Sequence, residues 1–176
     1  MTKNLDIEGL QSIAENYDLF YIDLWGVIHN GIKLHKKAIL VLKELLKMNK
    51  NFILLTNAPR PNEAVKIFLE KMGMNKELRG HVFSSGEASL SYLKKKHRSQ
   101  KFYHVGPPRD FDLFKDFKNY KSNKINDCEY LLCTGLFDEH DKDLNFYKDL
   151  LEGYSNKKMI CTNCLLYTSP SPRDHQ

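Results

Sequence analysis

Two short apolar segments, each followed by a segment with helical periodicity, place the strongest constraint on how this chain can fold. Residues 18–27 and 51–59 are rich in aromatic and branched side chains, which is typical of buried strands. Residues 35–49 and 62–73 repeat apolar side chains at helical spacing. A strand, helix, strand, helix order predicts parallel strands joined by right-handed crossovers, and therefore an α/β fold.

The rest of the chain continues this alternation less regularly. A short helix is expected over residues 7–16 and a looser segment over 107–127. Ser85 is expected to begin a helix as its cap, with Glu87 in the first turn. Further strands are expected over 101–106, 129–135 and 157–163, and further helices over 86–97 and 143–153. These elements keep the chain up to residue 163 within the α/β class.

Polar residues end the first two predicted strands. Because the carboxyl ends of parallel strands meet at one edge of a sheet, Asp23 and Thr56 are expected to face the same crevice. Asp23 and the turn at Gly26 offer a nucleophile or metal ligand beside anion-binding amides. Thr56 and Asn57 add a hydroxyl and further amides. This set suits a phosphoryl group, although a strand-end aspartate also commonly caps a turn.

Composition argues against several classes of function. With 41% hydrophobic and 28% charged residues, the chain resembles an ordinary soluble globular protein. It shows no apolar run near the roughly 20 residues of a membrane span and no signal-peptide pattern, so no membrane partner and a cytoplasmic location are expected. The net charge of +5 comes from lysines scattered among asparagines and isoleucines, which does not favour a nucleic-acid partner.

Residues 164–176, CLLYTSPSPRDHQ, differ in style from the rest of the chain. The lysine and asparagine bias stops, and a Ser-Pro-Ser-Pro run follows directly after a predicted strand. A natural disordered tail would have such a composition. The string also resembles translated sequencing-adapter read-through. We therefore expect a non-native tail and exclude it from fold reasoning.

Several motifs occur in the order known from one enzyme superfamily. DLWGVIHNG at residues 23–31 is followed by LLTNAPR, SSGEAS, YHVGPPRD, LLCTG and MICTN. In this order they resemble the haloacid dehalogenase-like (HAD) superfamily, and within it the class IIA, or NagD-like, branch. The resemblance spans roughly residues 17–163.

The resemblance implies a Rossmann-like core and a Mg²⁺-dependent phosphatase of small phosphorylated metabolites, acting through an aspartyl-phosphate intermediate. Asp23 would be the nucleophile and a Mg²⁺ ligand, and the backbone carbonyl of Trp25 would be a second ligand. Thr56 would hydrogen-bond the transferring phosphoryl group, helped by amides near Trp25, Gly26 and Asn57.

The same resemblance implies a division into domains. Residues 1–85 would be the first part of the HAD core, and residues 86–163 part of an inserted C2-type cap, before the tail 164–176. The family's later motifs, a lysine and a metal-binding acid, would follow Asn163. The chain is therefore expected to be a fragment that hydrolyses nothing by itself, and the resemblance leaves oligomer formation open.

One position departs from the family pattern. The family's second aspartate, the usual general acid/base, is Trp25 here, and tryptophan has no titratable group. His29 is close enough in sequence to be a candidate substitute. The alternative function is a non-catalytic or regulatory protein that binds a phosphorylated ligand. A receiver-like domain phosphorylated on Asp23 is disfavoured, because only Asp23 is acidic between Asp18 and Glu44.

Three other polar segments suggest structural roles at least as strongly as functional ones. The acidic run 138–141 is more typical of a solvated loop before a helix than of a metal site. Arg109, in the segment GPPRD, is a candidate for holding an anion, but a turn set by two prolines explains the segment equally well. His104 is expected to pack within its strand.

Deleting residues 164–176 removes no periodic apolar face, so the free energy of unfolding is expected to change by no more than about 0.5 kcal/mol. Denaturant melts of the shortened and complete chains measure this difference. A loss of several kcal/mol would show that the tail belongs to the native fold.

Overall fold

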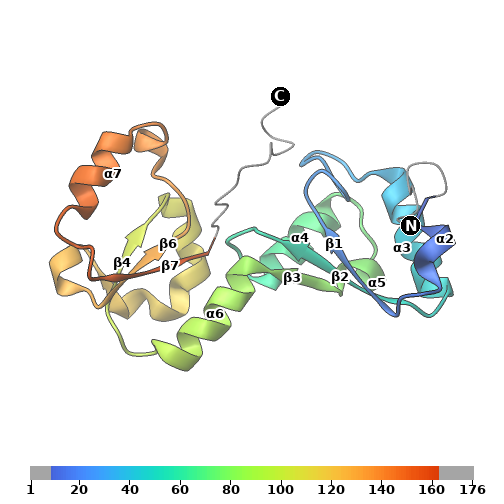
Figure 1. Ribbon diagram of the computed structural model, residues 1–176, viewed down its shortest axis with the longest axis horizontal. Helices are drawn as coiled ribbons and strands as arrows, with labels where there is room; N and C mark the ends of the chain where they lie inside the picture. Colours follow the sequence, from blue (N-terminus) through green and yellow to red (C-terminus); the bar gives the residue numbers. More distant parts are fainter. Residues whose placement is uncertain (1–8, 163–176) are drawn as a thin grey trace. The chain divides into compact units, whose positions relative to one another are not determined.

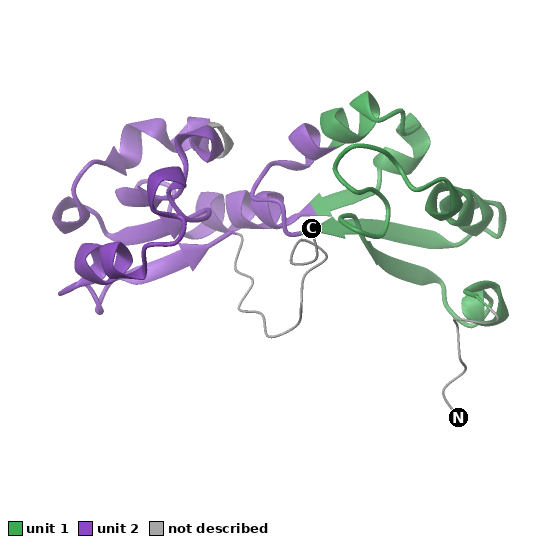
Figure 2. Ribbon diagram, turned by 90° about the horizontal axis from the view of Figure 1, so that it is seen from above, with its two compact units in different colours: residues 1–56, 66–83 green, residues 57–65, 84–176 purple. Residues whose placement is uncertain are grey.

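The computed structural model (Figure 1) describes residues 9–162, apart from the side chains of residues 112 and 113. The chain forms two compact units (Figure 2): unit 1 contains residues 1–56 and 66–83, and unit 2 contains residues 57–65 and 84–176. The tail 164–176 and the start of the helix expected over 7–16 lie outside the described residues. Across 9–162, no helix is long and apolar enough to cross a membrane.

Unit 1 is built around a three-stranded sheet with strand order β1-β2-β3. β1 and β2 are parallel, with a register that runs from Leu19 opposite Asn51 to Asp23 opposite Leu55. The elements up to the end of this sheet are, in chain order, α2 (Gln11–Ala14), β1 (Leu19–Asp23), α3 (Lys36–Lys47), β2 (Asn51–Thr56), α4 (Asn62–Lys71), α5 (Lys76–Arg79) and β3 (Val82–Ser84). The α/β class and the parallel pairing predicted from the sequence are confirmed.

Apolar periodicity explains how these elements pack. Alternation along β2 buries Phe52 and Leu54, and the helical spacing of α3 buries Leu42 and Leu45. α3 contacts β2, so these side chains share one core, and burying each contributes roughly 1.5–3 kcal/mol. Asn49, with φ of 54°, turns the chain from α3 into β2.

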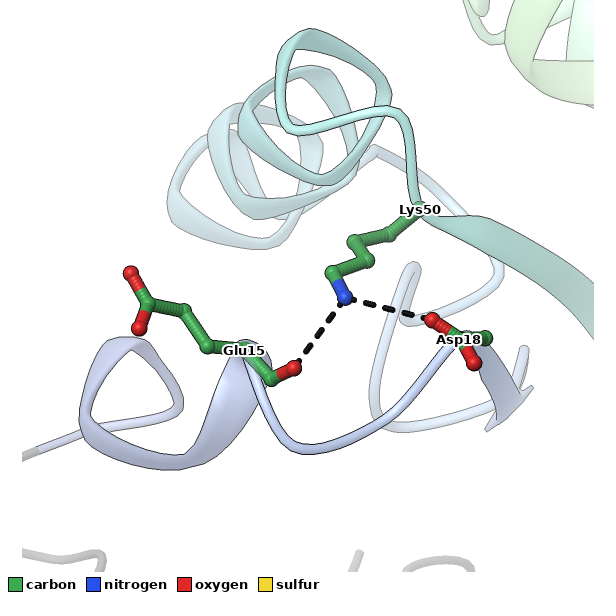
Figure 3. Close-up of polar contacts among 3 residues, drawn as sticks. All are labelled: Glu15, Asp18 and Lys50. Carbon is green, nitrogen blue, oxygen red and sulfur yellow. Dashed lines mark hydrogen bonds and ion pairs between the residues drawn. The ribbon is translucent and has the colours of Figure 1, made fainter.

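Lys50 joins the residues before β1 to the start of β2 (Figure 3). Its Nζ donates to the backbone carbonyl of Glu15 at 3.2 Å and to Oδ1 of Asp18 at 3.4 Å. The neighbouring Asn51 N–H donates to the Asp18 carbonyl at 3.0 Å. Because Asp18 is fully exposed and its charge is screened, the main effect of this group of contacts is to fix where the two strands start.

Unit 2 contains a second sheet, parallel throughout, with strand order β5-β4-β6-β7. Its core contains Leu93, Phe102, Phe114 and Leu132. The elements of this unit are α6 (Ser85–Lys96), β4 (Phe102–Val105), the 3-10 helix η1 (Pro108–Tyr120), β5 (Lys121–Ser122), η2 (Ile125–Asp127), β6 (Tyr130–Cys133), η3 (Asp138–His140), α7 (Leu144–Leu151) and β7 (Lys158–Cys161).

The start of α6 differs from the sequence prediction by one residue. Ser84, and not Ser85, is the N-cap, because its Oγ accepts a hydrogen bond from the Glu87 N–H at 3.0 Å. The Glu87 carboxylate in turn accepts from the Asn62 N–H at 3.0 Å. The prediction of Glu87 in the first turn holds, and the cap moves to the last residue of β3.

Residues 57–65 are held against the start of α6 by backbone contacts. Gly86 N–H donates to the Ala58 carbonyl at 3.1 Å, and the Ser84 N–H donates to Oδ1 of Asn62 at 2.8 Å. A Cβ on Gly86 would overlap the backbone of Arg60, so a glycine is needed there. These contacts explain why this short segment belongs to unit 2.

The apolar run 18–27 is longer than the strand it contains. β1 ends at Asp23, the residue predicted to end it, because the chain turns at Leu24, whose carbonyl accepts from the N–H groups of Ile28 and His29 at 2.9 and 3.1 Å. The looser segment expected over 107–127 contains η1 and the short strand β5. β5 and β3 are too short to show an apolar pattern, so neither is predicted.

β1 is also less buried than expected, because one face of the sheet in unit 1 is exposed. The register places Tyr21 and Asp23 on the same face, opposite the side that buries Phe52. We call the apolar side chains on this side of the sheet the open face. They are listed here with their exposed fractions: Leu19 (40%), Tyr21 (66%), Leu55 (36%) and Phe83 (44%). Exposed apolar patches of this kind favour association.

The chain is expected to self-associate through the open face, and Tyr21→Lys is expected to increase the monomer fraction, because a charge there opposes burial. Sedimentation velocity over a range of concentrations measures this fraction. Ile32→Lys is the control, since Ile32 is 85% exposed but lies outside the open face. Equal association of both variants and the unsubstituted chain would contradict the assignment of this face.

Candidate active site

Asp23 and Thr56 lie at the carboxyl edge of the sheet in unit 1, as predicted. β1 ends at Asp23 and β2 at Thr56, and the Leu24 N–H still donates to the Leu55 carbonyl at 3.1 Å. Asp23 is exposed, and its Oδ1 accepts from the Leu24 N–H at 2.8 Å, which orients the carboxylate. Thr56 is half-buried, and Asn57 follows it as an exposed residue. A carboxylate and a hydroxyl therefore end adjacent parallel strands.

The turn after Asp23 depends on a glycine. Gly26 has φ of 78°, a conformation that favours glycine, and its N–H donates to the His29 carbonyl at 2.8 Å. Residues 25–34 form a small hairpin with isolated bridges from Trp25 to His29 and from His29 to Leu34. Asn30 closes its tip, with its Oδ1 accepting from the N–H groups of Ile32 and Lys33. The Gly26 N–H is thus engaged inside the hairpin, and any contribution of Gly26 to phosphoryl binding comes from the shape of the turn.

Trp25 packs into this hairpin. The indole is partly exposed, and its six-membered ring lies on Gly31, where an added Cβ would be 2.6 Å from Cη2 and 2.9 Å from Cζ3 of Trp25. Gly31 has φ of 89°, a second reason for glycine at this position. The indole also meets the His29 ring edge to face, with centroids 5.4 Å apart and planes at 83°. Gly31 and His29 together fix the indole.

His29 is held as a neutral ring, which does not suit a substitute general acid. Its Nδ1 accepts from the Gly31 N–H at 3.0 Å, so the ring proton is on Nε2, and a second proton on Nδ1 would break that bond. Burial and the charge of His35 lower the pKa of His29, while Asp23 raises it by a smaller amount. On its other side the ring packs edge to face on Phe68, with centroids 5.6 Å apart.

A second polar cluster lies at the carboxyl edge of the sheet in unit 2, and it is buried. His104 Nε2 is 2.9 Å from Oγ1 of Thr134, so the two side chains share a hydrogen bond. The Asp110 carboxyl group interacts with Thr134. The cluster therefore combines an imidazole, a hydroxyl and a carboxyl group out of contact with solvent.

Burial shifts both ionisable groups of the cluster toward the neutral form. It raises the pKa of Asp110, against the opposing effects of Thr134 and Arg109. It lowers the pKa of His104 to about 4, with a further contribution from Lys121. Gly106 follows β4 with φ of 145°, and a Cβ there would overlap Oγ1 of Thr134. Glycine at 106 therefore leaves room for the Thr134 hydroxyl beside His104.

Arg109 lies beside this cluster but is engaged in an ion pair at the surface. It pairs with Asp138 of the acidic run 138–141, and the hydrogen bond to that carboxylate raises the pKa of Arg109. His140 of the same run lies 3.9 Å from Asp143. In the part of the chain that the structure describes, no three His, Cys, Asp or Glu side chains are grouped to hold a metal ion.

Comparison with known protein families matches residues 20–118, more than half of the chain, to the haloacid dehalogenase-like hydrolases. The chain belongs to this family. The matched region begins in β1 and ends in η1, so it includes Asp23, Trp25 and Thr56. A search of curated proteins finds no match.

Similar solved structures agree with this membership and share the fold. A haloacid dehalogenase-like hydrolase from Brucella suis 1330 is 25% identical with a TM-score of 0.73, covering 93% of this chain and 60% of that one. NagD from E. coli K-12 is 17% identical with a TM-score of 0.59, covering 83% and 56%. Glycerol phosphate phosphatase from Mycobacterium tuberculosis, in complex with magnesium, is 19% identical with a TM-score of 0.50, covering 69% and 37%. The chain thus spans 60% or less of the length of these structures.

The sequence alone did not identify the residues that hold the site side chains in place. Gly31 stands at the end of DLWGVIHNG, where a second glycine in a short loop is a signal for a close approach. Nothing in the sequence connects His29 with Phe68, or His104 with Thr134, because these contacts depend on the packing of separate elements.

His104 gives a testable pH dependence. The pKa of His104 is about 4 in the folded chain and 6.5 in the unfolded chain. Between these values the unfolded chain binds a proton at His104 that the folded chain does not bind. The contribution of His104 to the free energy of unfolding is therefore complete above pH 6.5 and is lost as the pH falls toward 4. His104→Gln is expected to lose less stability over this window in thermal melts. His140→Gln, at a more exposed histidine, is the control. Equal pH profiles for His104→Gln and the unsubstituted chain would contradict the assignment.

Proposed function

We propose that the chain is part of a phosphatase of small phosphorylated metabolites in which Asp23 is the nucleophile. The observation that carries this proposal is the exposed Asp23 carboxylate at the end of β1, beside the strand that ends at Thr56. A carboxylate oxygen would attack phosphorus and form an aspartyl-phosphate as the bond to the alcohol breaks. Thr56 would donate to a phosphoryl oxygen, and Asn57 would add further neutral donors.

The residues present fit a Mg²⁺ ion. Proteins hold Mg²⁺ through one or two carboxylates and the substrate phosphate, with several waters retained. Asp23 supplies an exposed carboxylate, and the backbone carbonyl of Trp25 would supply a second oxygen. When bound, the ion would neutralise phosphoryl charge. Membership of the hydrolase family and the magnesium complex of the similar M. tuberculosis phosphatase support this cofactor.

Trp25 limits how the chain's own residues can assist the leaving group. The indole cannot protonate an alkoxide, and His29 is neutral and bonded to Gly31 through Nδ1. Among the described residues of this site no side chain replaces the acid, so the leaving group would depart as an anion and take its proton from water. General acid catalysis is typically worth about 10² to 10⁴ in rate, so this limit is large for alkyl esters.

The domain assignment is part of the same proposal. Residues 1–85 would be the first part of the hydrolase core, 86–163 part of a C2-type cap, and 164–176 a non-native tail. The family and the open face of unit 1 support a longer protein. We propose that it acts in the cytoplasm on a small phosphorylated metabolite, with oligomer formation open. The boundary between the two units at residue 84 is close to the proposed core and cap boundary, although 57–65 also belongs to unit 2.

A non-catalytic binder of a phosphorylated ligand is the second candidate. One observation favours it, which is the presence of tryptophan where the family has its general acid/base. Such a protein would bind phosphorylated ligands through the same Asp23 and Thr56 edge without turnover.

Two substitutions separate these functions in the longer protein that the proposal implies. Asp23→Asn is expected to abolish turnover, because it removes the nucleophile. Trp25→Asp is expected to raise turnover of an alkyl phosphate by a sizeable part of the 10² to 10⁴ typical of general acid catalysis, provided that the turn folds. Steady-state kinetics with one aryl and one alkyl phosphate measure both effects. Full activity of Asp23→Asn would refute the nucleophile, and no turnover by any of the proteins would favour the binder.

A further inference from the structure

The indole of Trp25 is a fixed aromatic surface two residues after Asp23. The two residues are separated only by Leu24, which is 1% exposed and faces the core, while Asp23 is exposed and Trp25 partly so. The contacts with Gly31 and His29 hold the indole in one orientation. A surface that is already ordered loses little conformational freedom when a ligand binds to it.

The chemistry of the leaving group points in the same direction. Without a general acid, the P–O bond breaks with its electron pair moving onto the departing oxygen, which leaves as an anion. A phenol has a pKa of about 10, as in tyrosine, whereas water, a guide to simple alcohols, has a far higher pKa. A phenolate therefore departs far more easily than an alkoxide. A site with an indole in place of the general acid is therefore better suited to phenyl esters, whose leaving group needs no proton, than to alkyl esters.

We infer that Trp25 binds the leaving group of the substrate, and that the site selects phosphate esters of flat, aromatic alcohols. This inference rests on the proposed function, because it assigns a substrate class to the Asp23 site. In the reaction, an Asp23 oxygen forms the bond to phosphorus, the bond between phosphorus and the aryl oxygen breaks, and the phenolate takes a proton from water. The indole would contact the departing ring by stacking or edge to face. Thr56 would orient the phosphoryl group.

The test compares phenyl phosphate with cyclohexyl phosphate, which has the same charge and nearly the same size but no aromatic ring. Ligand-observed saturation-transfer NMR of the 176-residue chain at low protein concentration, with Mg²⁺, measures both affinities. Phenyl phosphate is expected to bind about 2- to 10-fold more tightly, the range typical of an aromatic pair. Trp25→Phe is expected to keep this preference, and Trp25→Leu to remove it. Tyr17→Leu, at an aromatic residue that is 54% exposed and outside the hairpin, is the matched control and is expected to keep it.

An independent measurement covers the case in which Trp25→Leu does not fold. Trp25 is the only tryptophan of the chain, so its fluorescence reports on this site without any substitution. Phenyl phosphate is expected to change that fluorescence more than cyclohexyl phosphate or inorganic phosphate at equal occupancy. Equal affinity of the two esters for the unsubstituted chain, or a preference that survives in folded Trp25→Leu, would overturn the inference and leave the proposed function standing. Failure of all three phosphates to bind this chain would overturn the inference, whereas the proposed function is decided by the kinetics of Asp23→Asn in the longer protein.

Discussion

The parallel pairing of β1 with β2 is the interaction on which the candidate site depends. The register sets Asp23 opposite Leu55, so the carboxylate and the Thr56 hydroxyl reach the same edge of the sheet. A slip of one residue would turn Asp23 to the face that holds the core. At the other end of the strands, the contacts of Lys50 and Asn51 with Asp18 fix their starts. The site is thus determined by the pairing of two short strands and by the hydrogen bonds that fix their starts.

Both units place a functional or polar side chain against a glycine. In unit 1 the Trp25 indole lies on Gly31, and in unit 2 the Thr134 hydroxyl lies where a Cβ of Gly106 would be. In each case the glycine also has a positive φ, so conformation and space require the same residue. The two glycines allow side chains to sit closer to the backbone than any other residue would permit. The positions of the indole and of the Thr134 hydroxyl are consequences of that closeness.

Local patterns were sufficient to predict the elements and the residues at strand ends. The apolar runs and helical spacing predicted α3, α4, β2 and β4, and the rule for parallel sheets placed Asp23 with Thr56. The sequence could not show that β1 has one exposed face, because that depends on what packs on the sheet. Nor could it show that Ser84 rather than Ser85 caps α6, since both serines precede the helix and the choice is made by contacts with residues 60–62. The orientation of Trp25 is set by Gly31 and His29, and no periodicity encodes it.

The membership of residues 57–65 in unit 2 has a consequence for the modularity of this chain. The segment lies between β2 and the rest of α4, both in unit 1, yet its carbonyls and amides hydrogen-bond the first turn of α6. A cut before Ser84 would separate the Ser84 hydroxyl and the Gly86 N–H from their acceptors, the carbonyls of Arg60 and Ala58. Unit 2 therefore cannot be excised or exchanged between homologues as one contiguous piece of sequence without leaving polar groups at its first helix unpaired. Recombination between relatives would have to exchange residues 57–65 together with the part of unit 2 that begins at Ser84. The loop after Thr56 is therefore expected to evolve together with unit 2.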